Sequence, residues 1–188
     1  MAVTEAAGAR LIGVALPTLR KLQVSVMACS DGGEAVQTLR EAGYLGGAAV
    51  HVAFEHWLEE SSSSESSEPA TADPGDLSLS DFGERASHFF RDAGWGEVTF
   101  SSDDSDGTAM LDVVNCWESA DGPAGEVPGC HITTGMLAAF FGRIAAYPVS
   151  VLEAECAGSG SERCRFLLGN AELINYKWES MRDRAANS

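Results

Sequence analysis

Three cysteines and a glutamate in the last third of the chain have the residue types and spacing of a metal site: Cys130, Glu153, Cys156 and Cys164. Cys156 and Cys164 flank a Gly/Ser-rich turn. If the segments on either side are strands, they pair as a hairpin and bring the two thiols together. Structural zinc takes four ligands, which are thiolate, imidazole or carboxylate groups. The spacing therefore favours a tetrahedral metal, provided that another part of the chain supplies one more sulfur.

The geometry of a strand limits how Glu153 could join such a site. Glu153 precedes Cys156 by three residues, and in a regular strand an odd offset points to the opposite face. We therefore expect a bulge or a kink between them. Cys130 lies just before a predicted helix, which could return it to the sheet. The alternative from spacing alone is that Cys156 and Cys164 are small strand residues and Glu153 is a surface acid.

Composition sets the broad class. The chain has 188 residues, 45% of them hydrophobic, and a net charge of −16. This length indicates one domain, or one domain with an appendage. The negative charge makes direct binding to nucleic acid or to an anionic membrane surface improbable. We find no run of 18 apolar residues and no signal-peptide pattern, and expect a cytoplasmic location, where the five cysteines would be thiols.

Hydrophobic spacing predicts the elements that must position the site. The first half reads as helical at 10–22, with Pro17 as an interruption, at 33–42, ending at Gly43, and at 44–60. Serine, acid and proline then dominate residues 61–76, which read as a surface loop. The second half reads as a helix at 81–93 capped by Ser80, strands at 95–101 and 109–117, a helix at 135–146 capped by Thr133 or Thr134, strands at 149–156 and 164–168, and a helix at 171–184.

This order predicts an α+β domain. Its four-stranded antiparallel sheet consists of two hairpins, and helices cover at least one face. We divide the chain into an N-terminal helical part (1–60), the Ser/acid-rich loop (61–76) and the domain core (77–188), all within one compact domain.

From Trp117 onward the chain resembles the 4-vinyl reductase domain family. The resemblance rests on Asn115-Cys-Trp-Glu118, on Cys130-His-Ile-Thr-Thr-Gly135 with the following Ala-Ala-Phe-Phe-Gly142-Arg, and on the run from Glu153 to Phe166. Members include the sensor domains of phenol- and xylene-responsive activators and a bacteriochlorophyll-biosynthesis protein. The resemblance implies a fold similar to a vesicle-tethering complex subunit and to haem-based nitric oxide sensors. It also implies a homodimer.

The resemblance assigns roles to particular residues. By spacing, the zinc ligands of the aromatic-sensing members correspond to Cys130, Glu153, Cys156 and Cys164. Cys116 and Cys29 match no ligand position and are expected to be buried or free thiols. His131 could replace Glu153 as the fourth ligand, and ligand softness also admits iron. The resemblance further implies an apolar ligand pocket, with these lining candidates, each of which could equally be plain core: Trp117, Thr134, Val151, Met136 and Phe140.

The sequence contains no pattern that we can assign to catalysis. It has no dinucleotide or phosphate loop and no Ser/His/Asp arrangement, and four protein ligands would leave a zinc ion no open position for water. The favoured hypothesis is a stand-alone zinc-containing domain that binds a small hydrophobic or aromatic molecule and acts as a sensor or accessory protein. One alternative is an accessory factor or enzyme in tetrapyrrole 4-vinyl reduction. The other is a structural interaction module, with a protein partner and no ligand.

Overall fold

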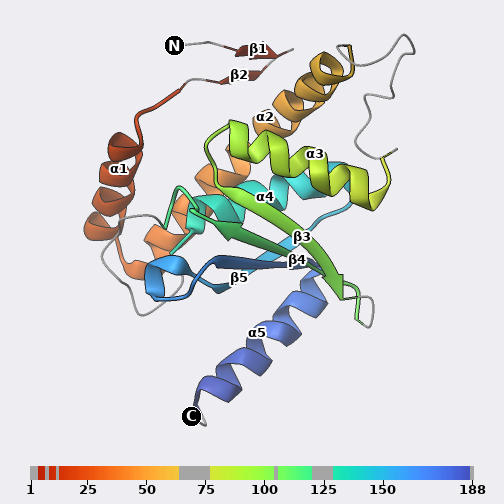
Figure 1. Cartoon of the computed structure of the whole chain (residues 1–188). Coiled ribbons are helices and arrows are strands. Elements are labelled where there is room, and N and C mark those ends of the chain that lie inside the picture. The colour runs from red at the N-terminus through yellow and green to blue at the C-terminus, as the bar shows by residue number, and fades with distance from the viewer. Residues whose placement is uncertain are drawn as a thin grey trace.

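The computed structural model describes residues 4–6, 9–11, 13–63, 77–103, 106–119 and 129–186. The elements run in this order: β1 (Thr4–Ala6), β2 (Ala9–Leu11), α1 (Leu16–Cys29), α2 (Gly32–Ser63), α3 (Leu79–Asp92), β3 (Glu97–Asp103), β4 (Thr108–Val114), α4 (His131–Ile144), β5 (Ser150–Glu155), a short 3-10 helix (Ala157–Ser159), β6 (Cys164–Gly169) and α5 (Ala171–Ala186). Figure 1 shows them in sequence colours. Most of the predicted Ser/acid-rich loop lies outside the described residues.

The main sheet confirms the predicted α+β class. Its four strands are all antiparallel in the order β3-β4-β6-β5. Each hairpin is local, β3 with β4 and β5 with β6, and the two hairpins join where β4 pairs with β6. This central pairing places Cys164 opposite Val113, at the start of β6.

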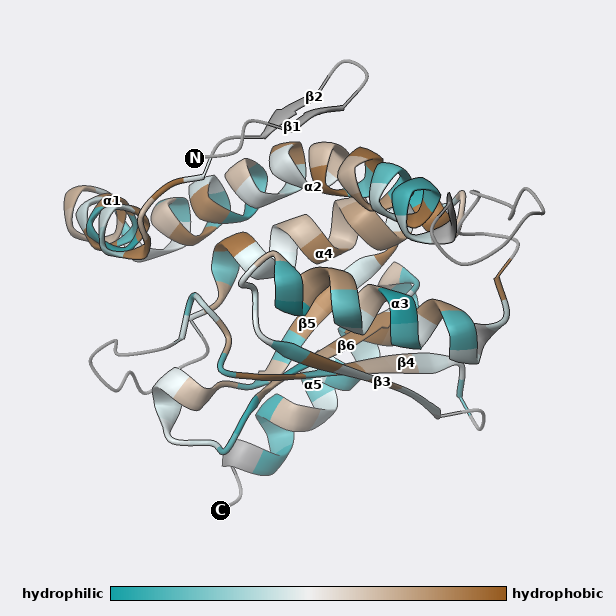
Figure 2. Cartoon of the chain, turned by 45° about the horizontal axis from the view of Figure 1, so that its top comes forward, coloured by the Kyte–Doolittle hydropathy of each residue, from teal (hydrophilic) through white to brown (hydrophobic). Residues whose placement is uncertain are grey.

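The two faces of the sheet pack against different helices. Alternate residues such as Phe100, Leu111 and Phe166 share one face, which contributes to the large apolar core beneath α2, α3 and α4. Leu152 and Leu167 point to the other face, where they pack against Ile174 of α5. Figure 2 shows the resulting layers, with α2 and α4 stacked above the sheet and α5 beneath it. None of the described helices combines the length and hydrophobicity that a membrane span requires.

Helix α2 corrects the predicted break at Gly43, because it continues without interruption from Gly32 to Ser63. Gly43 serves a packing function instead. A Cβ at this position would lie 2.0 Å from the backbone oxygen of Ile132, and one at Gly135 would lie 1.9 Å from the backbone oxygen of Arg40. Glycines on both helices therefore allow α2 and α4 to approach until their backbones touch, which fixes the start of α4.

The N-terminal segment also departs from prediction. Pro17 does not interrupt a helix but lies in the first turn of α1, where its missing N–H costs no hydrogen bond. The small β1–β2 hairpin was not predicted. No residue of α1 is buried, and Leu22 and Val24 are more than half exposed. Helix α1 thus lies on the outside of α2 rather than in the core.

Candidate metal centre and ligand cleft

A β-bulge brings Glu153 and Cys156 to the same side of β5. Glu153 pairs with Phe166, but Glu155 pairs with the very next residue, Arg165, so Ala154 is an extra residue in β5. The bulge converts the three-residue offset between Glu153 and Cys156 into an effective offset of two. Both side chains therefore face the helices, as the sequence required for a shared ion.

The four predicted ligands lie together in the interior. One donor atom from each of Cys130, Glu153, Cys156 and Cys164 lies within 4.8 Å of the others, and all four residues are buried. The Cys130 sulfur is 3.8 Å from that of Cys156 and 3.6 Å from that of Cys164. In a tetrahedral site with zinc–sulfur bonds of about 2.3 Å, two sulfurs are separated by about 3.8 Å. The spacing of the sulfurs therefore fits a zinc-sized ion.

The Glu153 carboxylate completes this fit. Its Oε2 accepts a hydrogen bond of 2.8 Å from the backbone N–H of Cys130. Its Oε1 is buried and has no hydrogen-bond partner among the described residues. Burial raises the pKa of Glu153 to about 8, because the ion loses its hydration. A bound cation would supply a partner for Oε1 and would favour the ionised carboxyl, so these residues fit a divalent metal.

Glu118, rather than Thr133 or Thr134, holds the start of α4, which corrects the predicted cap. Cys130 is the N-cap residue. Glu118 accepts hydrogen bonds from the backbone N–H groups of Ile132 (3.0 Å) and Thr133 (2.8 Å), which are otherwise unpaired at a helix start. Burial raises its pKa to about 7, against the opposing effect of these N–H groups. The contact fixes the helix that carries Cys130.

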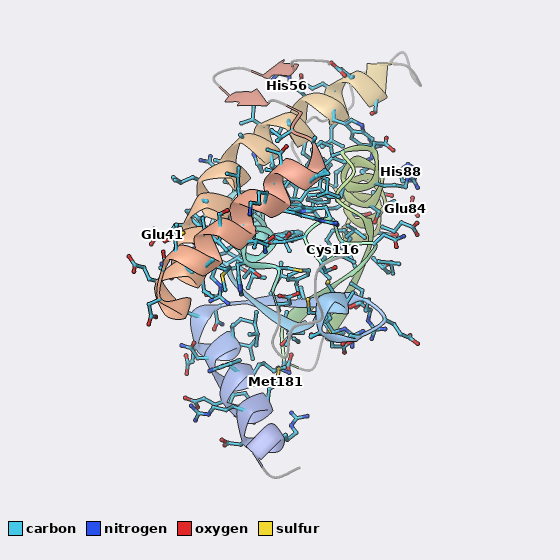
Figure 3. The ribbon with its side chains drawn as sticks, turned by 90° about the vertical axis from the view of Figure 1, so that its left-hand side faces the viewer. Glu41, His56, Glu84, His88, Cys116 and Met181 are labelled. Carbon is cyan, nitrogen blue, oxygen red and sulfur yellow. The ribbon has the colours of Figure 1, made fainter. Side chains whose placement is uncertain are left out.

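The segment Cys116–Glu118 connects three parts of the interior. The buried Cys116 sulfur lies 3.9 Å from the Cys130 sulfur, and Figure 3 shows this side chain inside the molecule. The Trp117 ring contacts Trp95 edge-on at 5.7 Å, and its indole nitrogen is buried without a hydrogen-bond partner in the described chain. Glu118 also accepts from the Gln23 side chain, which ties α1 to α4.

Two other residues resolve as follows. Cys29 is exposed and Cys116 is buried, as expected of thiols outside the ligand set. His131 is buried beside Cys130, and burial lowers its pKa. Among the described residues, the donor atoms that gather at the cluster belong to Glu153 and the three cysteines, and His131 is not one of them.

A cleft of about 970 Å³ opens between α3, the β3–β4 hairpin and the end of α4. Apolar side chains dominate its wall, including Phe82 from α3, Phe100 from β3 and Phe141 from α4. These three rings contact one another at 5.7–6.1 Å. Glu84 and His88 of α3 also line the cleft and point outward in Figure 3, so they form a polar rim around an aromatic floor.

The predicted pocket residues occupy different places. Met136 and Phe140 are fully buried in the core, where Phe140 touches Phe90 at 5.3 Å. Thr134 is buried, and its hydroxyl donates to the backbone oxygen of Cys130. Thr134 and Val151 line a second cleft of about 630 Å³, bordered by α2, α4, β5 and α5. The larger cleft is instead lined by Phe82, Phe100 and Phe141, which the sequence reasoning missed. Their shared signal was aromatic residues on separate elements, which only the fold brings together.

The fold and the buried cluster define the class of protein: an α+β domain with three cysteines and one glutamate beneath its second hairpin. Residues 110–170 match the family model of the vinyl-4-reductase domain. This segment begins in β4, ends after β6 and contains all four residues of the cluster. The resemblance to the 4-vinyl reductase family is therefore confirmed for this part of the chain. No curated protein matches the chain.

Solved structures show the same fold. The phenol-responsive sensory domain of the transcription activator PoxR, solved with phenol, is 16% identical, with a TM-score of 0.64 over 94% of this chain and 83% of that chain. A vinyl-4-reductase family protein from Methanocaldococcus jannaschii is 14% identical, with a TM-score of 0.43 over 85% of this chain and 83% of that chain. The likeness to the sensory domain extends well beyond residues 110–170 and confirms the fold of nearly the whole chain.

Proposed function

We propose that this chain is a zinc-stabilised sensor or accessory domain that binds a small hydrophobic or aromatic molecule. The observation that carries the proposal is the aromatic-floored cleft of about 970 Å³ between α3 and the sheet. Its volume lies within the range of small-molecule sites, which are typically apolar with a few polar groups. The similarity to a sensory domain that was solved with phenol supports the same ligand class.

The metal part of the proposal assigns Cys130, Glu153, Cys156 and Cys164 as the ligands. A zinc ion held by four protein groups contributes folding energy and leaves no coordination position for a reacting water. The four groups come from the N-cap of α4 and from the β5–β6 hairpin. The ion would therefore fasten α4 to the sheet, and α4 also contributes Phe141 to the cleft.

Binding of defined probes tests the ligand part. We would titrate the purified protein with phenol, 2-naphthol and a medium-chain fatty acid, and measure binding by calorimetry. Gly83→Leu should abolish binding, because its side chain would extend from α3 toward Phe100, which lies 3.6 Å from a Cβ at this position. Gly46→Leu is the matched control, since a Cβ there meets nothing within 4 Å.

The outcomes separate clearly. Saturable binding at one molecule per chain, lost in Gly83→Leu and kept in Gly46→Leu, supports the proposal. Failure of the wild-type chain to bind all three probes contradicts it and favours an interaction module. Equal binding by both variants contradicts the position of the site. The homodimer remains a separate prediction, tested by the mass of the particle in light scattering.

A further inference from the structure

The sulfur cluster contains one thiol more than the ligand set uses. Cys130 is in contact with three other sulfurs: Cys156 at 3.8 Å, Cys164 at 3.6 Å and Cys116 at 3.9 Å. In a site of three sulfurs and one oxygen, each sulfur has two sulfur neighbours. A sulfur with three neighbours near 3.8 Å is the arrangement found at each corner of a four-sulfur tetrahedron.

The position of Cys116 favours a role at the metal. It is 1% exposed, and it lies just after β4, on the segment that also provides Glu118. The Glu118 carboxylate holds the start of α4, whose N-cap is Cys130. The backbone that carries Cys116 is therefore attached to the same helix start as Cys130, and its thiol lies on the cluster without a dedicated ligand partner.

Glu153 is the donor that Cys116 could replace. One Glu153 oxygen already accepts from the Cys130 N–H, so only Oε1 is free to bind an ion. Zinc accepts both thiolate and carboxylate ligands, and softer metals favour thiolate. A centre with five donors for four positions can exchange one oxygen for one sulfur while the fold is maintained.

We propose that Cys116 is an alternative fourth ligand, so that this centre can hold its metal through three thiolates and Glu153 or through four thiolates. The inference rests on the metal binding proposed above. When Cys116 binds, its thiol releases one proton to solvent. The four-thiolate form would suit soft ions, whereas the carboxylate form admits harder ones.

X-ray absorption at the zinc edge tests this inference, because it counts sulfur neighbours at about 2.3 Å and oxygen neighbours at about 2.0–2.2 Å. Glu153→Gln should still hold one zinc per chain, with four sulfurs. Adding Cys116→Ser to Glu153→Gln should weaken zinc binding by roughly 100-fold or more in competition with a chromophoric chelator. Cys29→Ser, which removes the exposed thiol, is the matched control and should change nothing.

Each result decides one proposal. Glu153→Gln protein with three sulfurs around zinc, or with the same zinc affinity whether or not Cys116 is present, would overturn the inference. So would a folded Glu153→Gln protein that loses zinc, with folding checked by circular dichroism. A wild-type chain that takes up no zinc on reconstitution contradicts the proposed metal site itself. A wild-type chain with zinc, together with a negative Glu153→Gln result, leaves that site standing and removes only Cys116.

Discussion

Close contact between α2 and α4 makes Gly43 a sensitive position. In Gly43→Ala, the new Cβ would lie 2.0 Å from the backbone oxygen of Ile132 and 2.8 Å from its carbonyl carbon. An ordinary contact begins near 3.4 Å, so the backbones must separate by about 1.4 Å. No side-chain rotation can relieve this overlap, because both helices meet there through backbone atoms. The start of α4, with Cys130, must therefore move.

The expected magnitude follows from two opposing effects. Overpacking in a core costs roughly 1–3 kcal/mol, and backbone contacts lie at the upper end of that range. Alanine in place of glycine within a helix stabilises by about 1 kcal/mol. We expect Gly43→Ala to lower the free energy of unfolding by about 2 kcal/mol, which corresponds to roughly 4–8 °C in Tm for a chain of this size.

Gly46→Ala provides the matched control on the same helix. A Cβ at Gly46 meets nothing within 4 Å, so only the gain in helix stability remains, and Tm should rise by roughly 2–4 °C. Urea titration followed by circular dichroism measures both variants, and zinc content is measured in parallel. Equal stability of the two variants would refute the close approach of the helices. Full zinc affinity in a destabilised Gly43→Ala would show that the start of α4 does not position Cys130.

Three further predictions concern side chains. Cys164→Ser should lose the metal and lower Tm by several degrees, whereas Cys29→Ser should retain both, as measured by elemental analysis and calorimetry. The pKa of Glu118 is raised from 4.5 to about 7, so its contribution to stability is present below pH 4.5 and is lost as pH rises to about 7. Glu118→Gln should remove that decline, which amounts to at most about 3 kcal/mol, and an unchanged pH profile of unfolding would contradict it. Arg165 binds Asp112 through two hydrogen bonds of 2.7 Å and lowers the pKa of that carboxyl, so Arg165→Met should cost about 1 kcal/mol at neutral pH. This cost should shrink as acid protonates Asp112 in urea titrations, and a constant cost would argue against the ion pair.

Local patterns were sufficient to predict the strands and the need for a bulge. The alternation of apolar residues and the turn residues identify both hairpins, because those signals act over a few neighbouring positions. The odd offset between Glu153 and Cys156 required an irregularity, and an extra residue, Ala154, is present between them. The four cluster residues could be named from spacing and resemblance because each lies in or beside a recognisable motif.

Signals that depend on distant contacts are misleading when only one segment is considered. Gly43 has the pattern of a helix end, since glycine commonly follows one, but its use is decided by Ile132 of another helix. The threonines of α4 have the pattern of its cap, although Glu118, more than ten residues earlier, accepts its N–H groups. Competing explanations of this kind cannot be separated within one segment, because the deciding atom lies elsewhere in the chain.

The sequence by itself determined the fold class, the order of the hairpins and the residue types available for a metal, since these depend on local periodicity and composition. Only the tertiary structure decided which groups meet. It set Cys116 against Cys130 and assembled Phe82, Phe100 and Phe141 around one cleft. The physical reason is that these contacts arise from helix packing on the sheet, where the close α2–α4 approach and the pairing of β4 with β6 fix positions that no local pattern encodes.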